Sequence, residues 1–202
     1  MRRRLRRSPT TDAGITLTEL LVSMAIFSVV SAMVTTAAIT GLHQQTQVAN
    51  RDDALAQLRT ALQRIDRDIR STYPLLSASS TRLVLQEVDA TVTKTVTFEV
   101  TGSTLTWGQT NLSPNGTTTT IPTRVLLDDL VDTATRPVFS FAPTPDYTAP
   151  SGTGVNPTTC ELDGAIDIGC VGTITVRLSV QPPYLKAAVT MSDNGTQLRN
   201  AA

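Results

Sequence analysis

The fold of this chain is decided by residues 14–39, which read GITLTELLVSMAIFSVVSAMVTTAAI. Fifteen of the twenty residues from Leu20 to Ile39 are apolar, and no charged side chain follows Glu19 until Arg51. No proline interrupts the run, and a helix of about twenty apolar residues crosses the ~30 Å hydrocarbon core of a bilayer. The stretch therefore predicts a membrane-spanning helix close to the N-terminus.

A short basic leader with five arginines, residues 1–13, precedes Gly14. A secretory signal peptide is cut behind its apolar stretch. Here the small residue lies in front of the stretch, so a cut after Gly14 would remove residues 1–14 and keep the apolar segment. The order of basic leader, Gly, apolar residue, Thr-Leu, one residue, Glu and apolar run resembles the type IV prepilin signal. The resemblance implies that prepilin peptidase cuts after Gly14 and that Ile15 becomes a methylated N-terminus.

Glu19 stands at the head of the apolar run, where a carboxylate is expensive in lipid and usually has a partner. The resemblance supplies one, the N-terminal amine of a neighbouring subunit. This pairing would set the axial position of a subunit in a filament, because an unpaired buried charge costs several kcal/mol. The alternative is a capping box, since Glu19 follows the hydroxyl of Thr16 by three residues. Capping does not explain a glycine behind a basic leader, so the filament role is favoured.

The charges are unevenly distributed along the chain. There are 17 basic and 17 acidic side chains in all, and removing residues 1–14 leaves 12 basic and 16 acidic ones. An acidic body disfavours a phosphate-binding surface, so we expect no nucleic-acid partner. The leader arginines predict a cytoplasmic N-terminus and a body on the other side of the membrane. The expected location is the cytoplasmic (inner) membrane, with the head outside the cytoplasm. The resemblance implies that the protein then enters an envelope or cell-surface filament.

The apolar segment, residues 15–42, is followed by a second helical pattern in residues 43–72. One narrow apolar stripe is formed by Val48, Leu55, Leu58, Leu62, Ile65 and Ile69. The opposite face has Arg59, Arg64, Arg67, Arg70, Asp66 and Asp68, with opposite charges at i,i+4 in Arg64–Asp68 and Asp66–Arg70. We interpret the stripe as packing on a core and the charged face as solvated, with a coiled coil as the alternative. Tyr73-Pro74 is expected to end the helix.

Residues 73–202 predict a strand-rich head, so the expected fold class is α+β: a long N-terminal helix packed on an antiparallel sheet. Alternating or β-branched runs place strands at 82–88, 92–100, 104–107, 126–131, 138–141, 173–180 and 184–191. Residues 111–120 are polar and are expected to be a loop. Residues 142–170 are rich in Pro, Gly and Thr and are expected to be one irregular loop.

The two cysteines of the chain, Cys160 and Cys170, lie in that second loop. An oxidising exterior favours a disulfide between them. A loop of this size would stabilise the fold by roughly 2.5–3 kcal/mol on the chain-entropy model. A zinc site is the alternative, but it needs further ligands, and the sole histidine is His43 on the helix.

The acidic residues of the same loop are Asp146, Glu161, Asp163 and Asp167. Asp163 and Asp167 are calcium candidates, as loops in some pilin-like proteins bind this ion. Their spacing matches no compact calcium loop, and a solvated acidic loop is the alternative. The sequence offers no Ser-His-Asp set and no pair of histidines, so it predicts neither an enzyme nor a cofactor.

The body is similar to a branch of the pilin-like family, the J-type minor pseudopilin of type II secretion and the W-type minor pilin. The similarity lies in residues 58–70, 96–105, 126–131, 176–180 and 198–200, while the loop 142–170 departs from the pattern. The resemblance implies a minor pilin or pseudopilin at or near a filament tip, with other pilins as partners through the N-terminal helix. The alternative is a signal-anchored extracellular binding protein outside any filament, which predicts that the leader stays attached.

Overall fold

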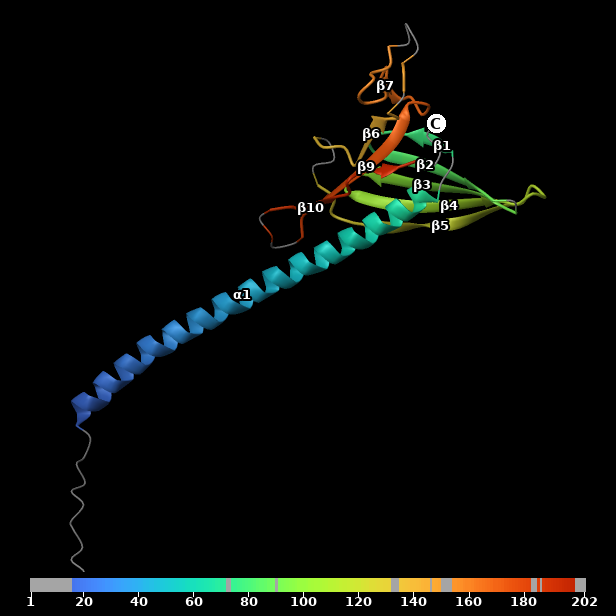
Figure 1. The fold of residues 1–202 in the computed structure, drawn as a ribbon. Coiled ribbons are helices and arrows are strands. Elements are labelled where there is room, and N and C mark those ends of the chain that lie inside the picture. The colour runs from blue at the N-terminus through green and yellow to red at the C-terminus, as the bar shows by residue number, and fades with distance from the viewer. Residues whose placement is uncertain are drawn as a thin grey trace, which may run out of the picture. The chain divides into compact units, whose positions relative to one another are not determined.

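The structure is a computed structural model that describes residues 16–71, 74–89, 91–131, 135–145, 147–149, 154–182, 185 and 187–198. The predicted leader, the cleavage site at Gly14 and the new N-terminus at Ile15 lie outside these ranges. The chain divides into two compact units, one up to Thr46 and one from Gln47 onward. Figure 1 shows the long helix and the strands of the second unit.

The helix α1 (Leu17–Arg70) is continuous over 54 residues, as the sequence predicts. It contains no proline, and Arg67 and Arg70 in its last turn interact favourably with the negative end of the helix dipole. The amide of Ser71 donates to the carbonyl of Arg67 at 3.0 Å and closes that turn. Pro74 follows shortly after, as expected for a helix end.

The first sheet is antiparallel, with its five strands in sequence order. The strands are β1 (Leu75–Ala78), β2 (Arg82–Val88), β3 (Thr93–Thr101), β4 (Thr104–Leu112) and β5 (Thr118–Leu127). Gly102 allows the tight β3–β4 turn because its φ is +61°. The predicted polar loop 111–120 is wrong at both ends, since β4 extends to Leu112 and β5 begins at Thr118. Threonine is β-branched, so this polar run also suits a strand at a sheet edge.

The second sheet is built around β9 (Val171–Val180), which pairs antiparallel with three other strands. These are β6 (Phe139–Pro143), β10 (Val189–Ser192) and β11 (Thr196–Gln197). The expectation that residues 142–170 form one irregular loop is wrong in part, because the segment contains strands. The segment begins inside β6 and contains a small hairpin of β7 (Glu161–Leu162) and β8 (Ala165–Ile166).

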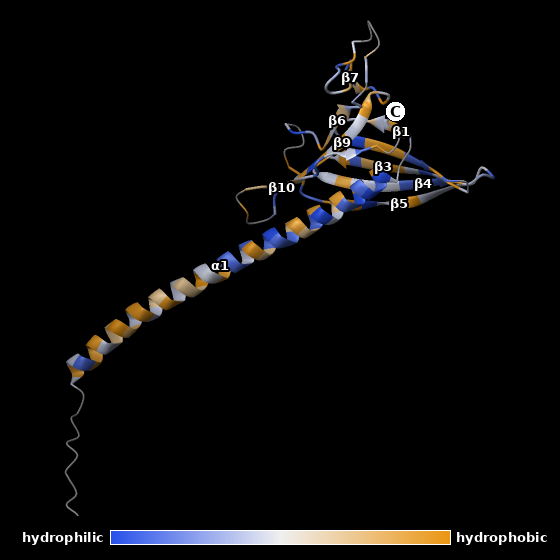
Figure 2. Ribbon diagram, viewed as in Figure 1, coloured by the Kyte–Doolittle hydropathy of each residue, from blue (hydrophilic) through white to orange (hydrophobic). Residues whose placement is uncertain are grey.

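The core of the second unit lies between the C-terminal part of α1 and the two sheets. From the helix it takes Ala54, Leu58, Ala61, Leu62, Ile65 and Ile69. The predicted stripe is therefore confirmed from Leu58 onward, but Leu55 is only half-buried and Val48 is 60% exposed. The largest fully buried side chains from the sheets include Phe98, Leu105, Phe139, Ile174 and Leu178. Figure 2 shows that the residues of α1 change along the helix from mainly hydrophobic to a mixture of hydrophobic and hydrophilic.

The predicted ion pairs Arg64–Asp68 and Asp66–Arg70 are present, with N–O distances of 3.1 and 2.9 Å. Their surroundings differ from the prediction, because Asp68 is buried rather than solvated. Its Oδ2 also accepts a hydrogen bond of 3.1 Å from Trp107 in β4. The guanidinium of Arg64 lies over the Trp107 ring, 4.4 Å from its centre. This polar cluster ties the helix to the first sheet at the edge of the core.

Candidate functional site: the N-terminal part of the helix

The start of α1 is capped by Thr16. The amide of Glu19 donates to Thr16 Oγ1 at 3.3 Å, and the amide of Leu20 donates to the Thr16 carbonyl at 3.1 Å. These bonds satisfy two of the amides that a helix start leaves without an intrahelical partner. Half of the capping-box alternative is thus present, through the backbone amide of Glu19.

The carboxylate of Glu19 does not complete that capping box. Its side chain is exposed, and it makes no hydrogen bond or ion pair with any of the residues that the structure describes. A carboxylate in the first turn is stabilised modestly by the helix dipole. Capping by Thr16 therefore leaves the charge of Glu19 available to a partner from another chain.

The helix surface that follows Glu19 is apolar and uncovered within its unit. Its large side chains are half exposed or more, among them Phe27 at 73% and Met33 at 67%. By length and composition α1 could cross a membrane, and it is the single such helix among the described residues. Such a surface is stable only against lipid or against other apolar helices.

Hydroxyl groups within this segment bond back to the helix itself. Ser23 donates to the carbonyl of Glu19 at 2.6 Å, and Thr35 and Thr36 donate to carbonyls four residues earlier at 2.8 Å. These hydroxyl groups are thus satisfied without water, as an apolar environment requires. Small side chains leave a shallow groove lined by Ala32, Met33, Thr36, Ala37, Thr40, Gly41 and Gln44. Grooves of this kind let a second helix approach closely.

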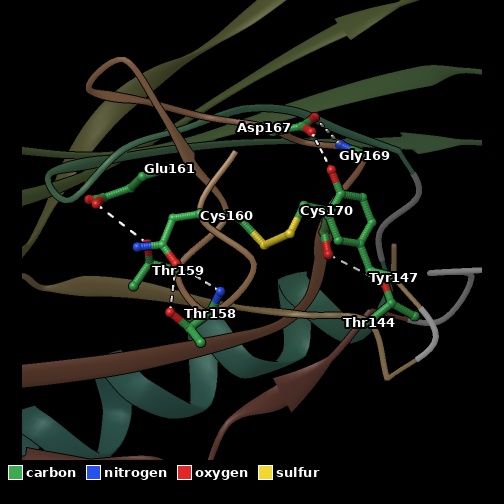
Figure 3. Close-up of a disulfide and its surroundings, with 10 residues drawn as sticks. Thr144, Tyr147, Thr158, Thr159, Cys160, Glu161, Asp167, Gly169 and Cys170 are labelled. Atoms are coloured by element: carbon green, nitrogen blue, oxygen red, sulfur yellow. Dashed lines mark hydrogen bonds between the residues drawn. A yellow bond between two sulfur atoms is a disulfide. The ribbon is translucent and has the colours of Figure 1, made fainter. Parts of the chain in front are cut away.

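The disulfide between Cys160 and Cys170 is formed, with an S–S distance of 2.08 Å and both residues fully buried (Figure 3). Backbone bonds reinforce it, since the amide of Asp167 donates to the Cys160 carbonyl at 2.8 Å. The amide of Thr144 donates to the Cys170 carbonyl at 2.9 Å. The disulfide therefore closes a compact segment and attaches it to the end of β6.

Asp167, one of the two calcium candidates, accepts a hydrogen bond with each of its two carboxylate oxygens. Oδ2 accepts from the hydroxyl of Tyr147 at 2.9 Å, and Oδ1 accepts from the amide of Gly169 at 3.0 Å (Figure 3). Desolvation, the hydrogen bond to Asp167 and the charge of Asp167 raise the pKa of Tyr147 above its ordinary value. Sequence reasoning missed this pair because no local pattern links residues twenty positions apart.

Asp163, the other calcium candidate, lies in the β7–β8 turn with a φ of +49°. Asp146 lies outside the described residues. Over the described ranges no three His, Cys, Asp or Glu side chains are grouped so that they could hold a metal ion. His43 is exposed on α1. The structure therefore assigns Asp167 a role in loop packing and brings no ligand set together around Asp163.

The comparison with protein families gives one match, which covers residues 10–35 and is described as the prokaryotic N-terminal methylation motif. The matched stretch contains Gly14, Ile15 and Glu19 and extends into the apolar part of α1. No curated protein and no solved structure matches the chain. The J-type and W-type resemblance of the body thus has no support beyond the residues themselves. The chain carries the N-terminal methylation signal of the type IV pilin family.

Proposed function

We propose that this protein is a non-enzymatic structural subunit of a type IV pilus-like or type II secretion filament. The observation that carries the proposal is the methylation motif at residues 10–35, which continues without a break into an uncovered apolar helix. Before assembly the helix would be held in the inner membrane through residues 15–42, with the head, residues 73–202, outside the cytoplasm. In the filament the same surface would pack against the helices of other subunits.

The first step of the proposal is processing of the N-terminus. Prepilin peptidase would cut after Gly14 and leave Ile15 as a methylated N-terminal residue. Mass spectrometry of the N-terminal peptide from producing cells tests both parts. We expect a peptide that begins at Ile15 and is one methyl group heavier than the unmodified one. Gly14→Val should abolish cleavage, and Gly41→Ala, at a helix position where a Cβ meets nothing within 4 Å, should not.

A leader that stays attached in the wild-type protein would refute this function. It would favour a signal-anchored protein whose head acts alone. Cleavage without recovery of the protein in sheared filaments would separate processing from assembly.

The second step is the pairing of Glu19 with the amine of Ile15 in a neighbouring subunit. The structure supports this role, since the Glu19 carboxylate has no bonding partner among the described residues and Thr16 caps the helix. A subunit that moved into an apolar bundle without this pair would bury a lone charge at a cost of several kcal/mol. The pairing would therefore fix how far each helix is inserted.

Glu19→Gln tests the pairing because it keeps the size of the side chain and removes its charge. We expect normal cleavage and a loss of about tenfold or more from the sheared filament fraction. Glu161→Gln, at an exposed carboxylate in the β7–β8 hairpin, is the matched control and should assemble normally. Equal assembly of Glu19→Gln and the control would remove Glu19 from the proposed mechanism.

A minor rather than a major role is the finer part of the proposal. It is supported by the similarity of residues 58–70 and 96–105 to J-type minor pseudopilins and W-type minor pilins. A minor subunit near the tip should be much scarcer in purified filaments than the main subunit, and gold-labelled antibody against the head should bind filament ends. Labelling along the whole length at high density would identify a major subunit instead.

A further inference from the structure

The helix α1 has an exposed face in the second unit, on the side opposite its buried stripe. We call Asp53, Ala56, Thr60, Gln63 and Arg67 the outer helix face, and all five are exposed. Spacings of three, four and seven residues keep them on one side of an α-helix. None of them contributes to the core. The face is polar, so lipid is not a suitable cover for it.

Charge is ordered along this face. At its N-terminal end Asp53 lines a recess together with Asp128 and Asp129 from the segment after β5. The ion pairs found among the described residues are Arg64–Asp68, Arg70–Asp66 and Lys94–Glu87, so none of these three carboxylates is neutralised by one. The acidic end therefore presents three carboxylates to a binding partner.

The C-terminal end of the face is basic. Arg67 lines an open depression with Gln63, Asp66, Arg70 and Ser71. Arg70 is paired with Asp66, whereas the Arg67 guanidinium makes no ion pair in the described part of the chain. Arg59 adds an exposed cation at the flank. One face thus has an acidic end and a basic end, with Ala56, Thr60 and Gln63 between them.

A face with this charge order is complementary to a second copy of itself in two arrangements. Antiparallel helices would bring Asp53 against Arg67 twice and give a closed dimer centred on Thr60. Parallel helices would do so only if one copy is displaced by the fourteen residues that separate Asp53 from Arg67, or about 21 Å at 1.5 Å per residue. Subunits that share one membrane orientation have parallel helices, which leaves the displaced arrangement.

We infer that the outer helix face binds a second, parallel copy of this chain, displaced by about 21 Å, with Arg67 of one copy against Asp53 of the other. The inference rests on the proposed function, which supplies the common orientation. Each copy uses two different surfaces, so the contact is heterologous and continues from copy to copy. It requires that copies enter the filament next to one another, which a scarce subunit can also satisfy.

Cysteine crosslinking in producing cells tests the register without touching the charges. Ala49 and Gln63 are exposed, uncharged and also fourteen residues apart. The double variant A49C/Q63C should give, under mild oxidation, a ladder of dimers, trimers and higher species on a non-reducing immunoblot. Two differently tagged copies should appear in the same bands. Cys160 and Cys170 do not compete, because they are fully buried in their own disulfide.

Charge reversal in this double-cysteine background tests the pairing. Asp53→Arg alone and Arg67→Asp alone should each reduce the ladder about tenfold, and the two together should restore it. Salt near 1 M should weaken it, since the Debye length falls to about 3 Å. Equal ladders in all four proteins would overturn the pairing. Cysteine at Val88, a 63% exposed position at the end of β2, controls for random collision.

Other outcomes would each overturn the inference. A dimer from Thr60→Cys alone would show the antiparallel arrangement, and a dimer from Ala49→Cys alone would show parallel helices without displacement. An adduct with a different protein in place of the ladder would show that the face binds another subunit. If the wild-type protein is cleaved and found in filaments but A49C/Q63C gives no ladder, this interface is wrong while the proposed function stands.

Discussion

Trp107 Nε1 donates a hydrogen bond of 3.1 Å to Asp68 Oδ2, and this contact links β4 to α1 across 39 positions of sequence. The same carboxylate oxygen accepts from Arg64 Nε at 3.1 Å. Asp68 is 5% exposed, so its charge depends on these donors for solvation. The contact is a buried polar connection between the helix and the first sheet.

Asp68→Ala should destabilise the head by about 2–4 kcal/mol, because the buried indole N–H of Trp107 and the Arg64 guanidinium lose their shared acceptor. Arg64→Ala should cost less, since the Arg64 side chain is 34% exposed and water screens its charge. Urea unfolding of the full-length protein in detergent, followed by circular dichroism, measures both. Asp52→Ala, at an exposed position of α1, should change the midpoint little. A midpoint for Asp68→Ala equal to that of Asp52→Ala would contradict the assignment.

Gly172→Ala should destabilise the second sheet by about 1–3 kcal/mol. A Cβ at this position would lie 2.7 Å from Thr144 Cα and 2.8 Å from Thr144 N, both of them backbone atoms that cannot move aside alone. Gly108→Ala in β4 is the matched control, because its Cβ would meet Thr123 Oγ1 at an ordinary 3.6 Å. The free energies of unfolding of the two variants test the difference. A loss for Gly108→Ala as large as that for Gly172→Ala would contradict it.

The double variant Cys160→Ser, Cys170→Ser removes the disulfide. It should lower the free energy of unfolding by about 2.5–3 kcal/mol, because the disulfide closes a loop of about ten residues. Both sulfurs are fully buried, so a thiol reagent applied to the native wild-type protein after brief mild reductant should find no reactive thiol. The same treatment in denaturant should label two thiols. Labelling under native conditions would show that the segment opens far more readily than its packing implies.

Tyr147 should make stability fall at alkaline pH. Its pKa is raised in the folded protein, so folding favours the neutral hydroxyl that donates to Asp167. This contribution is fully present below the unfolded pKa of about 10 and is lost as pH rises through the higher folded pKa. Tyr147→Phe lacks this hydroxyl and its contribution. The difference in free energy of unfolding between wild type and variant should therefore shrink from pH 8 to pH 11. A difference that is constant over this range would remove the linkage.

Several elements could be predicted from the sequence because each has a local signal. The apolar run from Leu20 to Ile39 indicates a helix by itself, and β2 occupies the predicted residues 82–88. The two cysteines, ten positions apart in a head expected outside the cytoplasm, indicated their own disulfide.

The parts that could not be predicted depend on tertiary contacts. Asp68 was assigned to a solvated face because a charged residue at a helical spacing gives no indication of a tryptophan 39 positions later. Val48 fits the apolar stripe, but the core begins only at Ala54. The threonine-rich start of β5 has the composition of a loop, and it becomes a strand by pairing with β4. The capping hydroxyl of Thr16 could be predicted from the sequence, whereas only the structure shows that the Glu19 carboxylate has no bonding partner among the described residues.

The order of segments along the chain has a consequence for the time course of folding. The buried stripe of α1 is synthesised before any strand that covers it, and β9, the centre of the second sheet, comes about a hundred residues after that stripe. Its pairings with β10 and β11 form from residues that emerge later still. Leu58, Ile65 and Ile69 therefore stay without their final cover until synthesis is nearly complete. In that interval the growing chain is most exposed to aggregation and proteolysis. A chaperone would then find the largest uncovered apolar surface to bind.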